Sequence, residues 1–146
     1  MNALFLGLAL IAGAPALKGP AKGDHPPIEG LWDLTEWYLD GQSVGIPPGT
    51  STEFLPKGVR KLKQGADQEA DERGYKLIPA SKPAAIDYIR PSEGGPPDIF
   101  LGIYKVDGDT LIISLGNQGN DRPKSFEKEN DGVWTYMKFK RAKKKE

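Results

Sequence analysis

The stretch FLGIYKVDGDTLIISLGNQGNDRP, residues 100–123, decides the fold class. Two runs rich in β-branched, leucine and aromatic residues, 99–106 and 109–115, flank the dipeptide Asp107-Gly108. Asp-Gly between apolar runs is a strong hairpin signal, because a type I′ turn needs positive φ at both central residues. The stretch therefore predicts two antiparallel strands that are joined by a tight turn and followed by a polar segment.

The same signal occurs on both sides of this hairpin. Asp40-Gly41 follows the aromatic-rich run 31–39, and an Asn-Asp-Gly sequence separates the runs 124–129 and 133–141. Many short strands between turns predict an all-β domain, an antiparallel up-and-down barrel or a sandwich of about eight strands. The remaining strands are expected, with weaker patterns, at 52–55, 58–63, 74–79 and 85–89. The polar segment 63–74 predicts a turn or a long loop.

Alternation along the strands gives a first view of the interior. In the last run, Thr135, Met137 and Phe139 share one face, while Trp134 lies on the other. In the first run both faces carry aromatic residues, and neither face is cleanly polar. Some aromatic side chains are therefore expected outside the barrel or at its mouth.

The composition excludes several classes of function. The chain has 146 residues, enough for one domain, and it has no cysteine, which excludes disulfides, thiolate catalysis and zinc-thiolate sites. Twenty basic and twenty acidic side chains cancel, so no overall field attracts nucleic acid, and no nucleic-acid partner is expected.

The N-terminal segment predicts export. Residues 1–16 are uncharged and apolar, and they end in Ala14-Pro15-Ala16, which resembles a signal-peptidase site. We expect a signal peptide at 1–16, a linker at 17–27, and a periplasmic or extracellular location. An uncleaved anchor or a buried N-terminal strand stays open as the alternative. At the other end, the basic tail 142–146 is expected to be solvated or to attach weakly to an anionic surface.

A short motif points to a known superfamily. Gly30-Leu31-Trp32 opens the first strand and resembles the G-x-W of the lipocalin-like (calycin) barrels. The resemblance implies that Trp32 closes one barrel end and that an arginine near the end of the chain packs over it. Arg141 is the candidate for this cation–π partner.

The wider pattern is more specific. The segments IEGLWDLTEWYLDGQSV, GYKLIPASKPAAIDY and FLGIYKVDGDTLIISLGNQGNDRPKSF, with the terminal WTYMKFKR, resemble a family of exported lipocalin-like domains of unknown function that is abundant in planctomycetes. The resemblance implies a barrel over residues 28–141 and export. It implies no reaction.

Four side chains are candidate ligand-binding residues: Trp37, Tyr104, Arg122 and Trp134. Arg122 has two interpretations. It pairs with a nearby carboxylate such as Asp121 or packs on an aromatic ring, or it recognises an anion at the mouth with its planar fork. Six positions are expected to serve the fold: Gly30, Trp32, Gly102, Asp107, Gly108 and Arg141. Gly102, inside a strand, indicates a bend or a close backbone approach.

The sequence contains few of the residue patterns that indicate an enzyme. The only histidine, His25, lies in the linker, which argues against a Ser-His triad and excludes a site built from several histidines. No metal and no cofactor are expected, and an enzyme that uses carboxylates is the least favoured hypothesis. The leading hypothesis is non-catalytic binding of a small apolar or amphipathic ligand inside the barrel. The alternative is a packed barrel that serves as a structural or protein-interaction module of the cell envelope.

Overall fold

The computed structural model describes residues 28–65, 69–127 and 133–142. The predicted signal peptide, the linker with His25 and the tail from residue 143 onward lie outside these residues. The described chain forms nine strands and one 3-10 turn: β2 (Gly30–Leu39), β3 (Gln42–Ser43), β4 (Thr50–Leu55), η2 (Pro56–Gly58), β5 (Val59–Gln64), β6 (Asp71–Ile78), β7 (Ala85–Arg90), β8 (Asp98–Asp107), β9 (Thr110–Leu115) and β10 (Thr135–Arg141).

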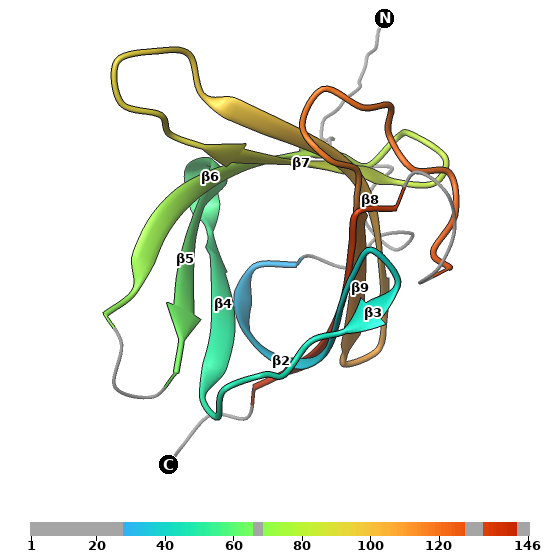
Figure 1. Cartoon of the computed structure of the whole chain (residues 1–146). Helices are drawn as coiled ribbons and strands as arrows, with labels where there is room; N and C mark the ends of the chain where they lie inside the picture. Colours follow the sequence, from blue (N-terminus) through green and yellow to red (C-terminus); the bar gives the residue numbers. More distant parts are fainter. Residues whose placement is uncertain (1–27, 66–68, 128–132, 143–146) are drawn as a thin grey trace, which may run out of the picture.

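Eight of these strands close into one antiparallel barrel (Figure 1). From β4 to β10 each strand pairs with its neighbours in sequence, β2 pairs with β4, and β10 pairs with β2 to close the ring. The short β3 pairs with β2 alone, as an extension beyond the wall. The predicted all-β, up-and-down barrel is therefore confirmed, and the sandwich alternative is wrong.

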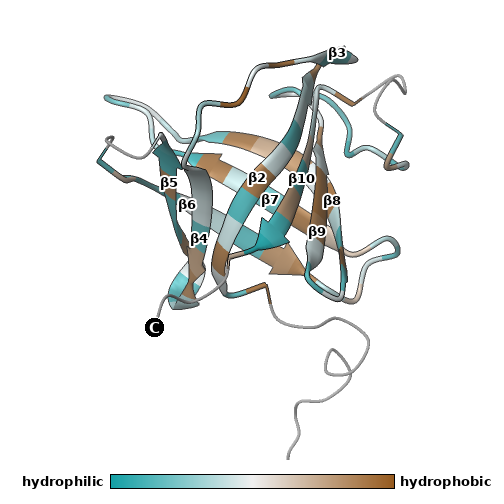
Figure 2. Cartoon of the chain, turned by 90° about the horizontal axis from the view of Figure 1, so that it is seen from below, coloured by the Kyte–Doolittle hydropathy of each residue, from teal (hydrophilic) through white to brown (hydrophobic). Residues whose placement is uncertain are grey.

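Alternation places the apolar residues inside. Bands of hydrophilic and hydrophobic residues alternate along several strands (Figure 2). On β9, Leu111 and Ile113 are fully buried, and on β10 Phe139 is 2% exposed. These residues share one face of their strands, as expected for side chains that fill a barrel interior.

A β-bulge explains why both faces of the first strand looked apolar in the sequence. Between β2 and β10, Glu36 pairs with Lys138 but Leu34 pairs with Phe139, so Thr35 is the extra residue. Its hydroxyl donates a hydrogen bond to the Lys138 carbonyl at 3.0 Å. The bulge shifts the alternation by one residue. Trp32 and Leu34 therefore point inward before it, and Trp37 and Leu39 point inward after it.

One predicted strand and one predicted loop are wrong. Within 124–129, the described residues 124–127 form no strand, and β10 pairs with β9 and β2 instead of with a hairpin partner there. The polar segment 63–74 was expected to be a loop, but β6 begins at Asp71, because pairing with β5 brings Arg73 opposite Arg60. In both cases, pairing with neighbouring strands decides the outcome over local composition.

The Asp-Gly turns differ from each other. At Asp40-Gly41 both residues have positive φ, 50° and 78°, as the predicted type I′ turn requires. In the β8–β9 hairpin, Asp107 pairs with Thr110, so the loop residues are Gly108 and the aspartate that follows it. There only Gly108 has positive φ, at 62°, as in a type II′ turn, which has glycine at its first central position. The turn thus lies one residue later than predicted.

Trp32 closes one end of the barrel. Its side chain is fully buried, and its indole nitrogen donates a 2.8 Å hydrogen bond to the carbonyl of Ile28. The guanidinium of Arg141 lies over the ring, 4.1 Å from the centroid. Gly30 has φ of 121°, and a Cβ there would lie 3.4 Å from the Arg141 guanidinium. The geometry implied by the G-x-W resemblance is thus present at this end.

Gly102 allows two strands and a side chain to meet. A Cβ at this position would lie 2.5 Å from the Ser114 carbonyl oxygen and 2.4 Å from Cδ2 of Leu115. The carbonyl oxygen belongs to the neighbouring strand β9, so relief would require movement of the wall. Gly102 is therefore needed for close backbone approach.

We expect Gly102→Ala to lower the free energy of unfolding by about 1–3 kcal/mol, the usual cost of overpacking a core. The control is Gly95→Ala, because a Cβ there meets no atom within 4 Å and the change should stay within about 0.5 kcal/mol. Urea unfolding of both variants checks the prediction, and equal stabilities would contradict it.

Candidate ligand-binding cavity

A cavity of about 300 Å³ lies inside the barrel, at the end opposite Trp32. Its lining includes Leu39 and Thr135, which pair with each other at the far end of the β2–β10 ladder from Trp32 and Arg141. The volume falls at the lower end of the range of roughly 300–1,000 Å³ typical of small-molecule sites. The exposed residue Gln64 also lines the cavity, so the cavity reaches solvent.

The two sides of the cavity differ in chemistry. One wall, formed by β2, β10 and the end of β9, is mostly apolar, and it contributes Leu34, Trp37, Leu39, Met137, Phe139 and Leu115. The opposite wall, formed by β4 to β7, is mostly polar, and it contributes Thr50, Thr52, Arg60, Gln64, Arg73 and Tyr88. Leu62 is the apolar member of this second wall. A molecule with one apolar and one polar side matches this division.

Two of the four sequence-predicted ligand residues line this cavity. The Trp37 indole nitrogen donates a 3.0 Å hydrogen bond to the Thr135 hydroxyl, which donates in turn to the Tyr38 carbonyl. Trp134 stacks on Phe100 with ring centroids 5.3 Å apart. Both indole rings are held in place by neighbouring strands and are part of the cavity wall.

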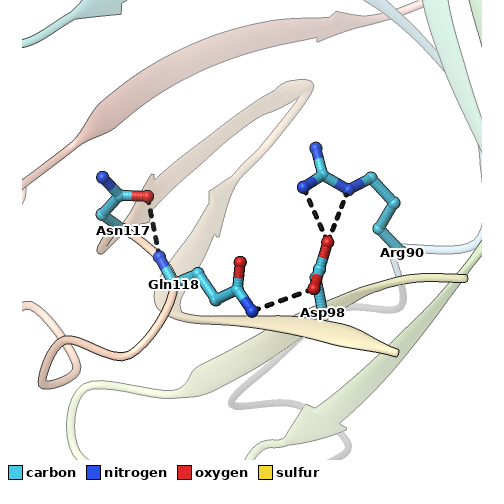
Figure 3. A network of polar contacts seen from close by, with 4 residues as sticks. All are labelled: Arg90, Asp98, Asn117 and Gln118. Atoms are coloured by element: carbon cyan, nitrogen blue, oxygen red, sulfur yellow. Dashed lines mark hydrogen bonds and ion pairs between the residues drawn. The ribbon is translucent and has the colours of Figure 1, made fainter. Parts of the chain in front are cut away.

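A polar network joins the end of β7 and the start of β8 to the segment after β9 (Figure 3). Arg90, at the end of β7, donates two hydrogen bonds to one carboxylate oxygen of Asp98, at 2.8 and 3.2 Å. The Gln118 side chain donates to the other oxygen at 2.9 Å. The Arg90 guanidinium also lies 5.1 Å from the centre of the Phe100 ring, on which Trp134 stacks. The segment after β9 is thereby tied to the β7–β8 end of the barrel.

Tyr104 and Arg122 do not line the cavity. Tyr104 is 3% exposed and belongs to the packed core, where β8 approaches the closed end. Arg122 lies on the outer face, where its Nη1 donates to Asp87 at 2.7 Å and to the Gly102 carbonyl at 2.9 Å. The expected pairing with a carboxylate is therefore present, although the partner is Asp87 and not Asp121.

Segment 116–127 covers the outside of the wall. It lies beside β7 and β8, outside the ring (Figure 1). Pro123 is buried, and the Lys105 ammonium lies 4.7 Å from the centre of the Phe126 ring. Ile103 is 1% exposed although it lies on the outer face of β8. The Arg-Pro pair thus anchors a cover on the barrel wall, and no role in the cavity is proposed for Arg122.

Arg60 is the most unusual residue of the cavity. It points inward from β5 and is 4% exposed, and its Nε donates a 3.2 Å hydrogen bond to the Gly74 carbonyl. Its guanidinium lies over the Tyr88 ring, 3.7 Å from the centroid. No carboxylate within the described ranges forms an ion pair with Arg60, and its Nη nitrogens have no hydrogen-bond acceptor there. Burial lowers the pKa of Arg60, Tyr88 and the charge of Asp71 oppose this shift, and the nearby charge of Arg73 adds to it.

The burial of the Arg60 charge costs about as much free energy as its contacts return. Burying an ion costs several kcal/mol even after relaxation. A desolvated cation–π contact returns about 2 kcal/mol, and a hydrogen bond to a charged group returns about 1.5–3 kcal/mol. These contacts offset the cost of burying Arg60 without giving a clear surplus. A hydrophobic residue of similar size is often neutral or stabilising at such a position.

The cavity lining carries positive charge only. Its charged members are Arg60 and Arg73, which face each other across the β5–β6 ladder. Arg73 is ion-paired with Asp71 at 2.9 Å, near the solvent. Among the described residues that line the cavity there is no aspartate or glutamate. The site is therefore suited to an anionic group rather than to a cation.

Sequence reasoning missed Arg60, Arg73 and Tyr88. A signal existed for Arg60, because in the segment VRKLKQ it alternates with lysines and shares a face with Leu62. An arginine on the apolar face of a barrel strand points inward. For Arg73 the signal was hidden, because the strand had not been predicted to begin before Gly74.

Among the described residues there is no group of three or more His, Asp or Glu side chains that could hold a metal ion. The described chain also has no helix of the length and apolar character needed to cross a membrane.

Comparisons with protein-family models, curated proteins and solved structures gave no match to the chain. The barrel is thus observed, and the resemblance to exported lipocalin-like domains stays a prediction.

The buried tyrosines predict how stability changes at alkaline pH. Burial raises the pKa of Tyr88 above its ordinary value of 10.0, although the charge of Arg60 opposes this shift. Above about pH 10 the unfolded chain therefore loses the phenol proton before the folded chain does, and the free energy of unfolding falls as pH rises. Below about pH 10 the contribution is constant.

Tyr88→Phe should reduce this alkaline loss of stability. The measurement is urea unfolding at several values between about pH 9 and about pH 11, where tyrosine titrates, on both proteins. Tyr75 and Tyr104, whose pKa values are also raised by burial, are present in both and supply the same background. Parallel pH curves for the two proteins would show that the Tyr88 phenol is not protected.

Proposed function

We propose that this barrel is a non-catalytic carrier that binds a small amphipathic molecule in its cavity. The observation that carries the proposal is the two-sided lining: an apolar wall on β2 and β10 faces a polar wall on β4 to β7. Small-molecule sites typically combine a mostly apolar surface with a few placed polar groups. A signal peptide at residues 1–16 would place this carrier in the periplasm or outside the cell.

The alternative of a packed structural barrel is less well supported. A packed barrel would fill both ends as Trp32 fills one of them, yet space of about 300 Å³ remains at the other. A protein-interaction module would show a contiguous apolar patch. The exposed large hydrophobic residues in the described ranges are Leu31 and Ile99, on β2 and β8, which do not pair with each other.

Filling the cavity should weaken binding of a neutral probe. Leu62→Trp places an indole in the cavity. The control, Leu31→Trp, makes the same substitution on the outside of β2, where Leu31 is 44% exposed. Fluorescence titration with aminoanthracene should give similar Kd values for the wild type and Leu31→Trp. The Kd for Leu62→Trp should be at least about tenfold higher, a loss of about 1.4 kcal/mol.

Two results would contradict the carrier proposal. If aminoanthracene does not bind the wild type, the cavity accepts no apolar guest. If it binds all three proteins equally, it binds elsewhere on the surface. Unfolding curves for the two variants establish that each is folded before binding is compared.

A further inference from the structure

We propose that Arg60, assisted by the hydroxyl of Tyr88, binds the carboxylate of an amphipathic ligand whose apolar part lies against the β2–β10 wall. The inference rests on the proposed function and names the chemical class of the ligand. It is carried by a buried cation that faces a cavity and has no carboxylate partner in the described chain.

Hydrogen-bonding capacity at Arg60 is left for a ligand. Arginine has five N–H donors in a planar fork that matches a carboxylate. One of them, on Nε, is used by the Gly74 carbonyl, and the guanidinium face is used by the Tyr88 ring. The Nη donors have no acceptor among the described residues, and the side chain lines the cavity. A carboxylate that enters the cavity would therefore meet donors that are already held in place.

Tyr88 supplies a second donor at the same place. It is 7% exposed, lines the cavity and contacts the Arg60 guanidinium. Its hydroxyl forms no hydrogen bond within the described ranges. Because burial raises its pKa, the phenol keeps its proton at neutral pH and can donate it in a hydrogen bond. The pair therefore offers a charged fork and a neutral hydroxyl to one anionic group.

The charge of the site favours a monoanion. Arg73 also lines the cavity, but Asp71 pairs with it at 2.9 Å. Arg60 is thus the cation of the lining that lacks a carboxylate partner within the described residues. One guanidinium matches one carboxylate, and the apolar wall on β2 and β10 lies across the cavity from it.

The test compares two molecules that differ in one group, octanoate and octanol. Each displaces aminoanthracene from the wild type, from Arg60→Met and from Lys61→Met. Arg60→Met removes the charge and keeps an apolar side chain of similar length. Lys61→Met removes a charge from the outer face of the same strand, where Lys61 is 42% exposed and 4.0 Å from Glu72.

In the wild type, octanoate should bind at least about tenfold more tightly than octanol, which corresponds to about 1.4 kcal/mol. This preference should disappear in Arg60→Met and persist in Lys61→Met. Aminoanthracene should still bind Arg60→Met, because the apolar wall is intact. Equal binding of octanoate and octanol to the wild type, with aminoanthracene bound, would overturn the carboxylate inference and leave the carrier proposal standing. Failure of all three molecules to bind the wild type would overturn both.

A measurement on the wild type alone covers the case in which Arg60→Met does not fold. Octanoate labelled with carbon-13 at the carboxyl group is titrated with acid, free and bound, and its NMR shift gives the carboxyl pKa. Contact with the Arg60 guanidinium should lower the bound pKa below the free value. A bound pKa above the free value would show a carboxyl group in an apolar site without a cation, and would overturn the inference.

Discussion

Pairing between β10 and β2 is the constraint on which the rest of the molecule depends. It joins the two ends of the described chain, leaves no open edge in the eight-stranded ring, and places Arg141 over Trp32. The pairing also sets the bulge at Thr35, which turns Trp37 inward. An open sheet would expose Trp32 and would have no interior.

Closure leaves an interior that the chain fills unevenly. An eight-stranded barrel is just wide enough to be filled by side chains or to hold one small ligand. Trp32 and Phe54 are buried to 1% or less, whereas Thr52 and Arg60, which pair with them on the neighbouring strands, face a cavity together with apolar residues. Charged and short polar side chains do not pack as hydrophobic residues do, and the space stays open beside them. The polar side chains that leave this part of the core incompletely packed are therefore the ones from which we infer ligand binding.

Local sequence signals predicted the strands well and the cavity poorly. The hairpin turn at Asp40-Gly41 and the position of Trp32 follow from short-range rules, because a turn or a motif is encoded by adjacent residues. Of the four predicted ligand residues, the two tryptophans line the cavity. Arg122 was a candidate ligand residue but lies on the outer face of the barrel. Local sequence does not show which side of the wall a loop covers, because this depends on tertiary packing. Arg60 was missed because a charged residue in a weak strand pattern looks like surface until the register is known.

Native mass spectrometry of the protein isolated from its own source tests the central claim most directly. The claim is that the barrel carries a small anionic amphiphile in the cavity beside Arg60. It predicts a reproducible additional mass of a few hundred daltons that is lost on denaturation and that fragments as a carboxylic acid. A mass equal to that of the chain alone, under several growth conditions, would contradict the claim and favour a barrel that works without a ligand.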